Sequence, residues 1–228
     1  MGALGIAHAV TPLERHALKL DAVHRPIVGL RSIGGCGGIY KLTDVISSHI
    51  DVRAATAEDL ESVNDIANQY IRETHYNFEL DPMTIEQRHE WFSHHADRGP
   101  HRVLVGLSGD LVIGFANSGR YRPEDGYDTS VETSIYLAPE AVGRGAGSKL
   151  YEALFKALEN EDIHRAYAGI ALPNPASIAL HERFGFKRVA HFTEQGRKFD
   201  RYCDVAWYEK PMGAQPESLE EEDPGTED

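Results

Sequence analysis

The spacing of apolar positions changes along the chain, and each spacing predicts a different element. Between residues 56 and 71 apolar positions recur every three or four residues, which predicts a helix. Thr56 at its start, with Asp59 three residues later, is typical of a capping box. The preceding VRAAT (52–56) favours a short strand. The ordered part of the chain is therefore expected to begin near Val52 with a strand and a helix.

The middle of the chain predicts a second helix, a hairpin and a further strand. Thr84 and Gln87 have the spacing of another helix start. The apolar runs HRVLVGL (101–107) and LVIGFANS (111–118) are separated by Ser-Gly-Asp, which predicts a β-hairpin. TSVETSIYL (129–137) predicts a strand. Its alternation places Val131, Thr133 and Ile135 on one face and Glu132, Ser134 and Tyr136 on the other.

The last part predicts two helices and three strands. SKLYEALFKALEN (148–160) has helical spacing, and RAYAGIAL (165–172) is typical of a buried strand. Asn174 and Pro175 begin a helix that ends at Gly185, because Asn caps the first turn and Pro suits the first helical position. FKRVAHFTE (186–194) and YCDVAWYEK (202–210) predict closing strands. The pattern divides the chain into an irregular extension (1–50), one domain (51–212) and a disordered tail (213–228).

Charge and composition exclude several classes of function. The formal net charge is −13, of which −7 lies in the tail and −6 in the rest. This balance argues against nucleic-acid binding, which needs positive surface. The two cysteines lack metal-ligand spacing, and no apolar run is long enough to span a membrane. We therefore expect a cytoplasmic protein without a metal, a membrane span or a nucleic-acid partner.

The segment VGRGAG (142–147) lies between the predicted strand and the following helix. A helix start exposes N–H groups without intrahelical partners, and glycines let the backbone curl around an anion. A phosphate cradle and a flexible turn both fit this segment. A triphosphate loop does not, because Lys149 lacks the Gly-Lys-Ser/Thr context. The glycines of SIGGCGGIY (32–40) lack that context as well.

VGRGAG also resembles the pyrophosphate-binding motif of the GNAT superfamily of N-acetyltransferases, usually (Gln/Arg)-x-x-Gly-x-(Gly/Ala). Gly145 and Gly147 match, whereas Val142 stands in place of Gln or Arg. Longer stretches are similar to the phosphinothricin acetyltransferase subgroup: VRAATAEDL, YRPEDGYDTSVETSIYL, LPNPASIALHERFGF and GRKFDRYCDV. The resemblance covers roughly residues 51–212. It implies an α/β fold of GNAT type, with a mixed, mostly antiparallel sheet flanked by helices.

The resemblance implies acetyl-CoA as co-substrate and a set of residues that bind it. The pyrophosphate cradle would comprise Gly143, Arg144, Gly145, Ala146, Gly147 and Ser148. Ile135, Tyr136 and Leu137 would lie along the pantetheine arm, whose amides can pair with a strand edge. Asn174 matches a cofactor-contacting Asn of the family, although it also fits a simple helix cap.

The resemblance also implies roles at the reacting groups. Glu132 would take the proton of the amine, directly or through water, and His181 would supply one to the thiolate. Arg122 and Pro123 match the substrate loop of the subgroup, and a guanidinium suits a carboxylate or phosphinate. Lys198 and Phe199 match a late loop near the substrate. A solvent-facing Glu132, a packing His181 and a solvated Arg122 are the structural alternatives.

Together these features predict transfer of acetyl to the α-amino group of a small amino acid, such as phosphinothricin or methionine sulfoximine. The resemblance also implies a homodimer. Two other hypotheses remain: a different acceptor (a polyamine, an aminophosphonate or a protein N-terminus), or a non-catalytic acetyl-CoA sensor. Glu132 and His181 together argue against the sensor, because a module that only binds needs neither an acid nor a base.

Overall fold

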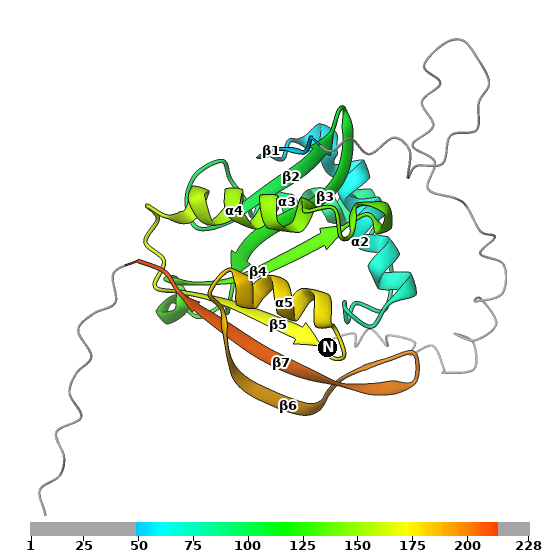
Figure 1. Ribbon diagram of the computed structural model, residues 1–228, viewed down its shortest axis with the longest axis vertical. Coiled ribbons are helices and arrows are strands. Elements are labelled where there is room, and N and C mark those ends of the chain that lie inside the picture. The colour runs from blue at the N-terminus through cyan, green and yellow to red at the C-terminus, as the bar shows by residue number, and fades with distance from the viewer. Residues whose placement is uncertain (1–48, 214–228) are drawn as a thin grey trace, which may run out of the picture. The chain divides into compact units, whose positions relative to one another are not determined.

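A seven-stranded sheet organises the part of the chain that the computed structural model describes, residues 49–213 (Figure 1). The strand order is β1-β2-β3-β4-β5-β7-β6. All neighbours are antiparallel except β4 and β5, which run parallel. The strands are β1 (Asp51–Ala54), β2 (Arg102–Ser108), β3 (Leu111–Arg120), β4 (Ser130–Leu137), β5 (Arg165–Ala171), β6 (Lys187–Lys198) and β7 (Arg201–Pro211). The expected mixed, mostly antiparallel sheet is confirmed.

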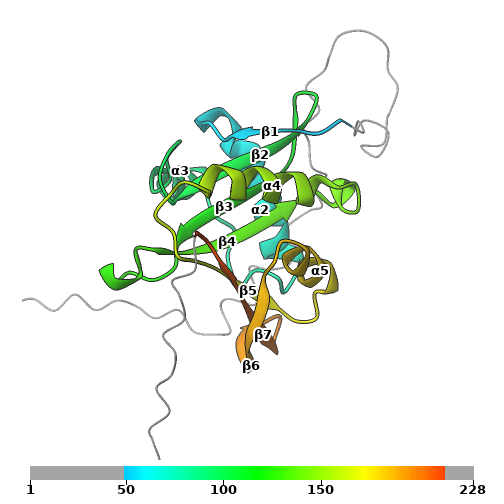
Figure 2. The same ribbon diagram turned by 60° about the vertical axis from the view of Figure 1, so that its left-hand side comes forward.

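Helices cover both faces of the sheet. The α-helices are α2 (Leu60–Glu73), α3 (Ile85–Ser93), α4 (Ala146–Leu158) and α5 (Pro175–Arg183). Short 3-10 turns span Ala57–Asp59, Asp125–Tyr127 and Pro139–Ala141. Helix α4 lies on one face of the strands and α2 on the other (Figure 2). No helix among residues 49–213 combines the length and apolarity that a membrane crossing requires.

The two faces bury separate cores, as the alternation of the strands requires. The larger core packs α4 (Leu150, Leu154 and Leu158) against strand residues that include Val131 and Ala166. The second core packs Val63, Ile66 and Ala67 of α2 against Val103, Val105 and Phe115. Val131 and Tyr136 lie in different clusters. The predicted two faces of β4 are therefore confirmed.

Local signals in the sequence account for most element boundaries. The side chain of Thr84 accepts from the Gln87 N–H, and Thr56 and Asp59 form the predicted capping box. Asn174 caps α5, whose first residue is Pro175. The hairpin of β2 and β3 turns at Gly109 and Asp110, where it was predicted. The domain boundaries at 50/51 and 212/213 stay predictions, and interpretations that concern residues 1–48 and 214–228 lie outside the described residues.

The end of the chain differs from the sequence interpretation. GRKFDRY was expected to be a loop, but it forms the tip of a hairpin in which β6 extends to Lys198 and pairs with Arg201. The turn has two residues, Phe199 and Asp200, both with positive φ (50° and 57°). Such turns usually contain Asn or Gly, so the sequence carried no turn signal here. Strand β6 also has two irregularities in its pairing, at 188–190 and 192–196.

Candidate active site

The sheet opens between β4 and β5. These strands pair only over Ser130–Arg165, Val131–Ala166 and Glu132–Tyr167. Beyond Glu132, β4 continues for five residues without pairing to β5, and β5 stays paired with β7 alone. A parallel strand that leaves its partner in this way exposes backbone hydrogen-bonding groups along one edge.

The cleft between the two strands has a volume of about 330 Å³. Its walls come from β4, β5, α5 and the end of α2. Of the predicted site residues, Ile135, Tyr136, Leu137, Asn174 and His181 all line it. The cleft thus brings together residues that lie up to 46 positions apart in the sequence (135 to 181). Val142, which is 51% exposed, lies at the cleft beside the glycine turn.

The open edge of β4 offers donors and acceptors to the cleft. The Ala138 N–H donates to the Ile113 carbonyl on β3 (2.9 Å). Because backbone groups of an antiparallel strand alternate in direction, the N–H and C=O of Leu137 and Ile135 point away from β3, toward the cleft. One of these groups already has a partner, since the Tyr70 hydroxyl donates to the Leu137 carbonyl (2.9 Å). This edge is suited to an extended, amide-containing ligand.

The glycine turn lies at the start of α4 and is open. Gly145 caps the helix with φ 85° and ψ −3°, a left-handed conformation that favours glycine. A Cβ at Gly143 or Gly145 would meet no atom within 4 Å. Within residues 49–213, the N–H groups of Gly145, Ala146, Gly147 and Ser148 have no acceptor in hydrogen-bonding distance. These groups are therefore available to an anion, whereas the Arg144 N–H is already bonded to the Ala141 carbonyl (3.4 Å).

Asn174 has one half of its amide engaged. Its Oδ1 accepts from the Ser177 N–H (3.2 Å) and so caps α5. The structure gives no acceptor for its Nδ2 group among the described residues, and the side chain lines the cleft. The two sequence interpretations of Asn174, helix cap and ligand contact, are thus compatible in one conformation.

Glu132 lies at the point where β4 and β5 separate. Its cross-strand neighbours are Gly119 on β3 and Tyr167 on β5. Burial raises the pKa of the Glu132 carboxyl, and the charge of Arg122 opposes that rise. Arg122 lies in the loop after β3, exposed, with its guanidinium over the rings of Tyr121 (5.1 Å) and Tyr127 (5.9 Å). A carboxyl with a raised pKa can accept and release a proton, and the neighbouring cation can attract an anionic ligand group.

His181 is buried, 3% exposed, and both of its ring nitrogens are bonded. Its Nδ1–H donates to the Ser177 carbonyl (2.8 Å), since a carbonyl can only accept. Nε2 therefore accepts from the Tyr151 hydroxyl (2.8 Å). Burial lowers the pKa of His181 and raises that of Tyr151 well above its usual value. The ring is thus held neutral at the wall of the cleft, with a protonated tyrosine beside it.

The remaining predicted substrate residues lie outside the cleft lining, as do Glu132, Arg122 and the glycine turn 143–148. Pro123 is exposed in the loop that carries Arg122, and Phe199 is 49% exposed at the hairpin tip. Lys198 is 3% exposed, and its ammonium donates to the Asn77 carbonyl. The structure brings Arg122 within electrostatic reach of Glu132, but it gives Lys198 a protein partner instead of an open position.

Tyrosines were missed by the sequence interpretation. Tyr70 and Tyr76 line the cleft, and Tyr151 holds His181 from 30 residues away. Tyr70 and Tyr151 lie on helices at the spacing of core residues, which predicts packing but not a hydroxyl partner. Their roles depend on tertiary contacts that no local pattern reports.

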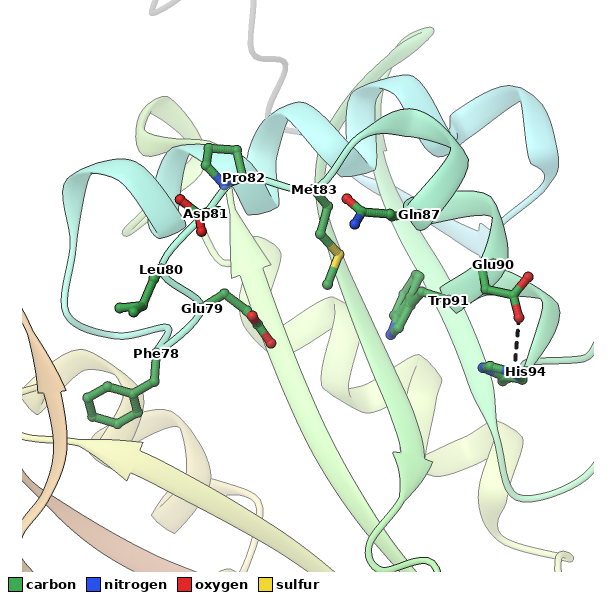
Figure 3. A pocket seen from close by; sticks show the side chains of 10 residues that line it. All are labelled: Phe78, Glu79, Leu80, Asp81, Pro82, Met83, Gln87, Glu90, Trp91 and His94. Carbon is green, nitrogen blue, oxygen red and sulfur yellow. Dashed lines mark ion pairs between the residues drawn. The ribbon is translucent and has the colours of Figure 1, made fainter. Parts of the chain in front are cut away.

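A second hollow, of about 700 Å³, lies beside α3 and the loop before it (Figure 3). Its lining includes Met83, Trp91 and three acidic side chains (Glu79, Asp81 and Glu90), and none of the predicted site residues. We therefore place the candidate site in the smaller cleft. Within residues 49–213, no group of three or more His, Cys, Asp or Glu side chains could hold a metal ion.

Comparisons with known proteins agree with this geometry. Residues 52–207 match the family model described as acetyltransferase (GNAT) domain. The chain is 49% identical over 168 residues to phosphinothricin N-acetyltransferase of Streptomyces coelicolor, covering 73% of this chain and 98% of that protein. It is 30% identical over 156 residues to the L-methionine sulfoximine/L-methionine sulfone acetyltransferase of Pseudomonas paraeruginosa, covering 68% of this chain and 91% of that protein.

Solved structures give the same result. A GNAT superfamily phosphinothricin acetyltransferase from Sinorhizobium meliloti, in complex with acetyl-CoA, superposes with a TM-score of 0.66 at 29% identity. The match covers 75% of this chain and 94% of that chain.

Proposed function

Because the chain belongs to the GNAT acetyltransferase family, we propose that it transfers acetyl from acetyl-CoA to the α-amino group of a small amino acid. The acceptor is of the phosphinothricin or methionine sulfoximine type. Relatives that carry these names align with 68% and 73% of the chain. The single observation that carries the proposal is the cleft, because its lining is continued along the chain by the unpaired N–H groups after Val142 and by the half-buried Glu132 before Thr133.

The chain's own residues fit acetyl-CoA. The N–H groups from Gly145 to Ser148 would hold its diphosphate, because they converge at a helix start and lack partners. The open edge at Ile135 and Leu137 would pair with its amides, and Asn174 Nδ2 would donate to it. Acetyl-CoA supplies the thioester carbonyl that the amine attacks and a thiolate as leaving group. Val142 removes one side-chain contact of the motif but leaves this backbone cradle unchanged.

Glu132 would act on the acceptor amine. An α-ammonium must lose a proton before its nitrogen can attack, and a partly buried carboxylate can accept that proton directly or through water. Arg122 would bind the carboxylate or phosphinate of the same acceptor, because its planar fork matches two oxygens. The charge of Arg122 also opposes the effect of burial on Glu132, which keeps more of that carboxyl ionised. Pro123 would shape the same loop.

His181 would supply the proton that the thiolate needs. The ring is neutral and both of its nitrogens are bonded in the structure, so His181 would first take up a proton released by the ammonium of the acceptor, and would exchange one of these bonds for the sulfur. Tyr151 fixes the ring orientation and keeps its own proton, because burial raises its pKa. Direct substrate contacts by Lys198 and Phe199 stay predictions.

A homodimer and a cytoplasmic location belong to the same proposal. Aromatic side chains gather near Arg122: Tyr127 is 41% exposed and packs against the half-buried Tyr121, which stacks on Tyr167 (4.4 Å). Such a surface beside the site supports association of two copies. Sedimentation of the purified protein at micromolar concentration tests this part, and a monomeric mass would contradict it.

A thiol-release assay tests the activity. The purified chain is mixed with acetyl-CoA and one acceptor at a time: phosphinothricin, methionine sulfoximine, methionine sulfone, spermidine, an aminophosphonate, or a peptide with a free N-terminus. We expect rapid release of free thiol with the amino acids and acetylation of their α-nitrogen by mass spectrometry. Release with spermidine or the peptide alone would overturn the choice of acceptor. No release with any acceptor would overturn the enzymatic assignment.

A further inference from the structure

The loop between α2 and α3 (74–84) borders the cleft through Tyr76, and both of its ends are fixed. At its start, the Thr74 hydroxyl donates to the Tyr70 carbonyl (2.9 Å). At its end, Met83 exchanges hydrogen bonds with Asn68: its N–H donates to Oδ1 and its carbonyl accepts from Nδ2, both at 2.8 Å. Between these ends the loop contributes Tyr76 to the cleft lining.

Asn77 uses all of its side-chain polar groups in the middle of this loop. Its Oδ1 accepts from the Glu79 N–H (2.7 Å), which closes a local turn. Its Nδ2 donates to the Tyr136 hydroxyl (3.1 Å) on the face of β4 that also carries Glu132. Its backbone carbonyl accepts from the Lys198 ammonium. Asn77 thus joins the tip of the β6–β7 hairpin to a tyrosine of the cleft.

Lys198 is unusual for a hairpin lysine because it is 3% exposed. Among the residues described, it forms no ion pair with a carboxylate within 4 Å. Removing an ammonium from water without such a partner is costly, so its bond to Asn77 must offset the loss of hydration. Burial lowers the pKa of Lys198, and the charge of Glu79, which lies in the same loop as Asn77, opposes this effect.

A second contact joins the same two segments. The ring of Phe78 lies against Gly196 of β6 so closely that a Cβ there would be 2.3 Å from it. Figure 3 shows Phe78 pointing away from Met83 and Trp91, on the side of the loop that faces the strands. Only glycine leaves room for the ring at this position.

We propose that this loop is the acceptor-side wall of the cleft, and that Lys198 and Gly196 form a latch, with Asn77 and Phe78 as its other half, that holds the wall closed. Lys198 is then a positioning residue: it acts on the acceptor through Asn77, Tyr76 and the Tyr136 hydroxyl. This inference rests on the proposed function, because it assigns the wall to the amine acceptor of that reaction. In this proposal Lys198 affects the substrate through its bond to the Asn77 carbonyl, not by touching the substrate itself.

Hydrogen exchange of the full chain measures the latch without any substrate. We compare Lys198→Met with Lys187→Met, which removes an exposed lysine from the start of the same strand. Losing a hydrogen bond to a charged donor should raise the equilibrium population of the open loop roughly 10- to 100-fold. Exchange should therefore accelerate in peptides covering 76–83, including the Glu79 and Met83 amides, and stay unchanged in α4. Gly196→Ala, which keeps the ammonium but displaces Phe78, should give the same pattern.

Kinetics then separate positioning from general damage. In the Lys198→Met variant we expect kcat/KM for the acceptor to fall about tenfold, a change of 1.36 kcal/mol, with the Kd for CoA within twofold of wild type. Lys198→Arg should recover most of this loss because it keeps a cationic donor. The latch would be overturned if the exchange rates of residues 76–83 in Lys198→Met equalled those in Lys187→Met. It would also be overturned if the affinity for CoA fell as much as kcat/KM for the acceptor. A wild-type chain inactive on every amino acid would instead overturn the proposed function, and the exchange experiment would still decide the latch.

Discussion

Replacing Gly145 by valine separates the two tasks of the glycine turn, folding and anion binding. The left-handed φ of 85° at this position costs a non-glycine residue about 1–2 kcal/mol, and more for a β-branched one. A Cβ there meets nothing within 4 Å, so the first added atom brings no steric clash of its own. The domain should therefore remain folded, with a modest loss in its free energy of unfolding.

The effect on acetyl-CoA binding should be much larger. Relief of the strain rotates the backbone at residue 145, and the N–H groups from Gly145 to Ser148 then no longer converge. Each hydrogen bond to a charged group contributes about 1.5–3 kcal/mol. Loss of two such bonds costs roughly 3–6 kcal/mol, which corresponds to about a 10²- to 10⁴-fold rise in Kd.

Gly109→Val provides the matched control. Gly109 also has positive φ (60°), also has nothing within 4 Å of its Cβ position, and lies in the β2–β3 turn outside the cleft lining. Isothermal titration with CoA and urea unfolding are measured on both variants. Both should lose similar stability, but only the Gly145 variant should lose CoA. A CoA affinity within threefold of the Gly109 variant would refute the cradle.

Three further variants test other parts of the molecule. Because burial raises the pKa of Glu132, kcat/KM should fall as the pH drops through that raised pKa; Glu132→Gln should slow turnover and remove this acid limb, with little change in CoA affinity. Tyr151→Phe leaves His181 Nε2 buried without a donor, which should cost about 1–2 kcal/mol of unfolding free energy, seen as a lower Tm, and an unchanged Tm would show that the bond contributes nothing. Burial raises the pKa of Asp59, but hydrogen bonds, chiefly that from Arg53, outweigh burial and hold this pKa below its usual value. The stabilisation by these hydrogen bonds is therefore present at neutral pH and is lost as the pH falls through the lowered pKa. Asp59→Asn should lower the free energy of unfolding by about 1–2 kcal/mol at pH 7, and this difference from wild type should shrink as the pH falls, measured by urea titration.

Elements with local signals could be predicted from the sequence. Asn174 and Pro175 carry the start of α5 in two adjacent residues, and the alternation around Glu132 gave both faces of β4. The glycine turn could be placed because Gly145 and Gly147 precede a helical pattern directly. In each case the physical cause of the structure lies within a few residues of its effect.

Features that depend on distant contacts could not be predicted. The Tyr151 hydroxyl meets His181 only because α4 and α5 pack on the same face of the sheet. The resemblance to the subgroup assigned Lys198 to a loop near the substrate, whereas its burial follows from a contact with Asn77, 121 residues away. Neither contact leaves a periodic trace in the sequence.

The irregular pairing of β6 has a consequence for the behaviour of the protein at high concentration. In the described part of the chain β6 pairs with β7 alone, and it exposes Val189 (51%) and Phe192 (47%). A regular free edge with such side chains would be a template for sheet-to-sheet aggregation. The breaks at 188–190 and 192–196 interrupt the ladder before a foreign strand could add many hydrogen bonds. Substitutions that make the β6–β7 pairing regular would therefore make the protein more prone to aggregate through this edge.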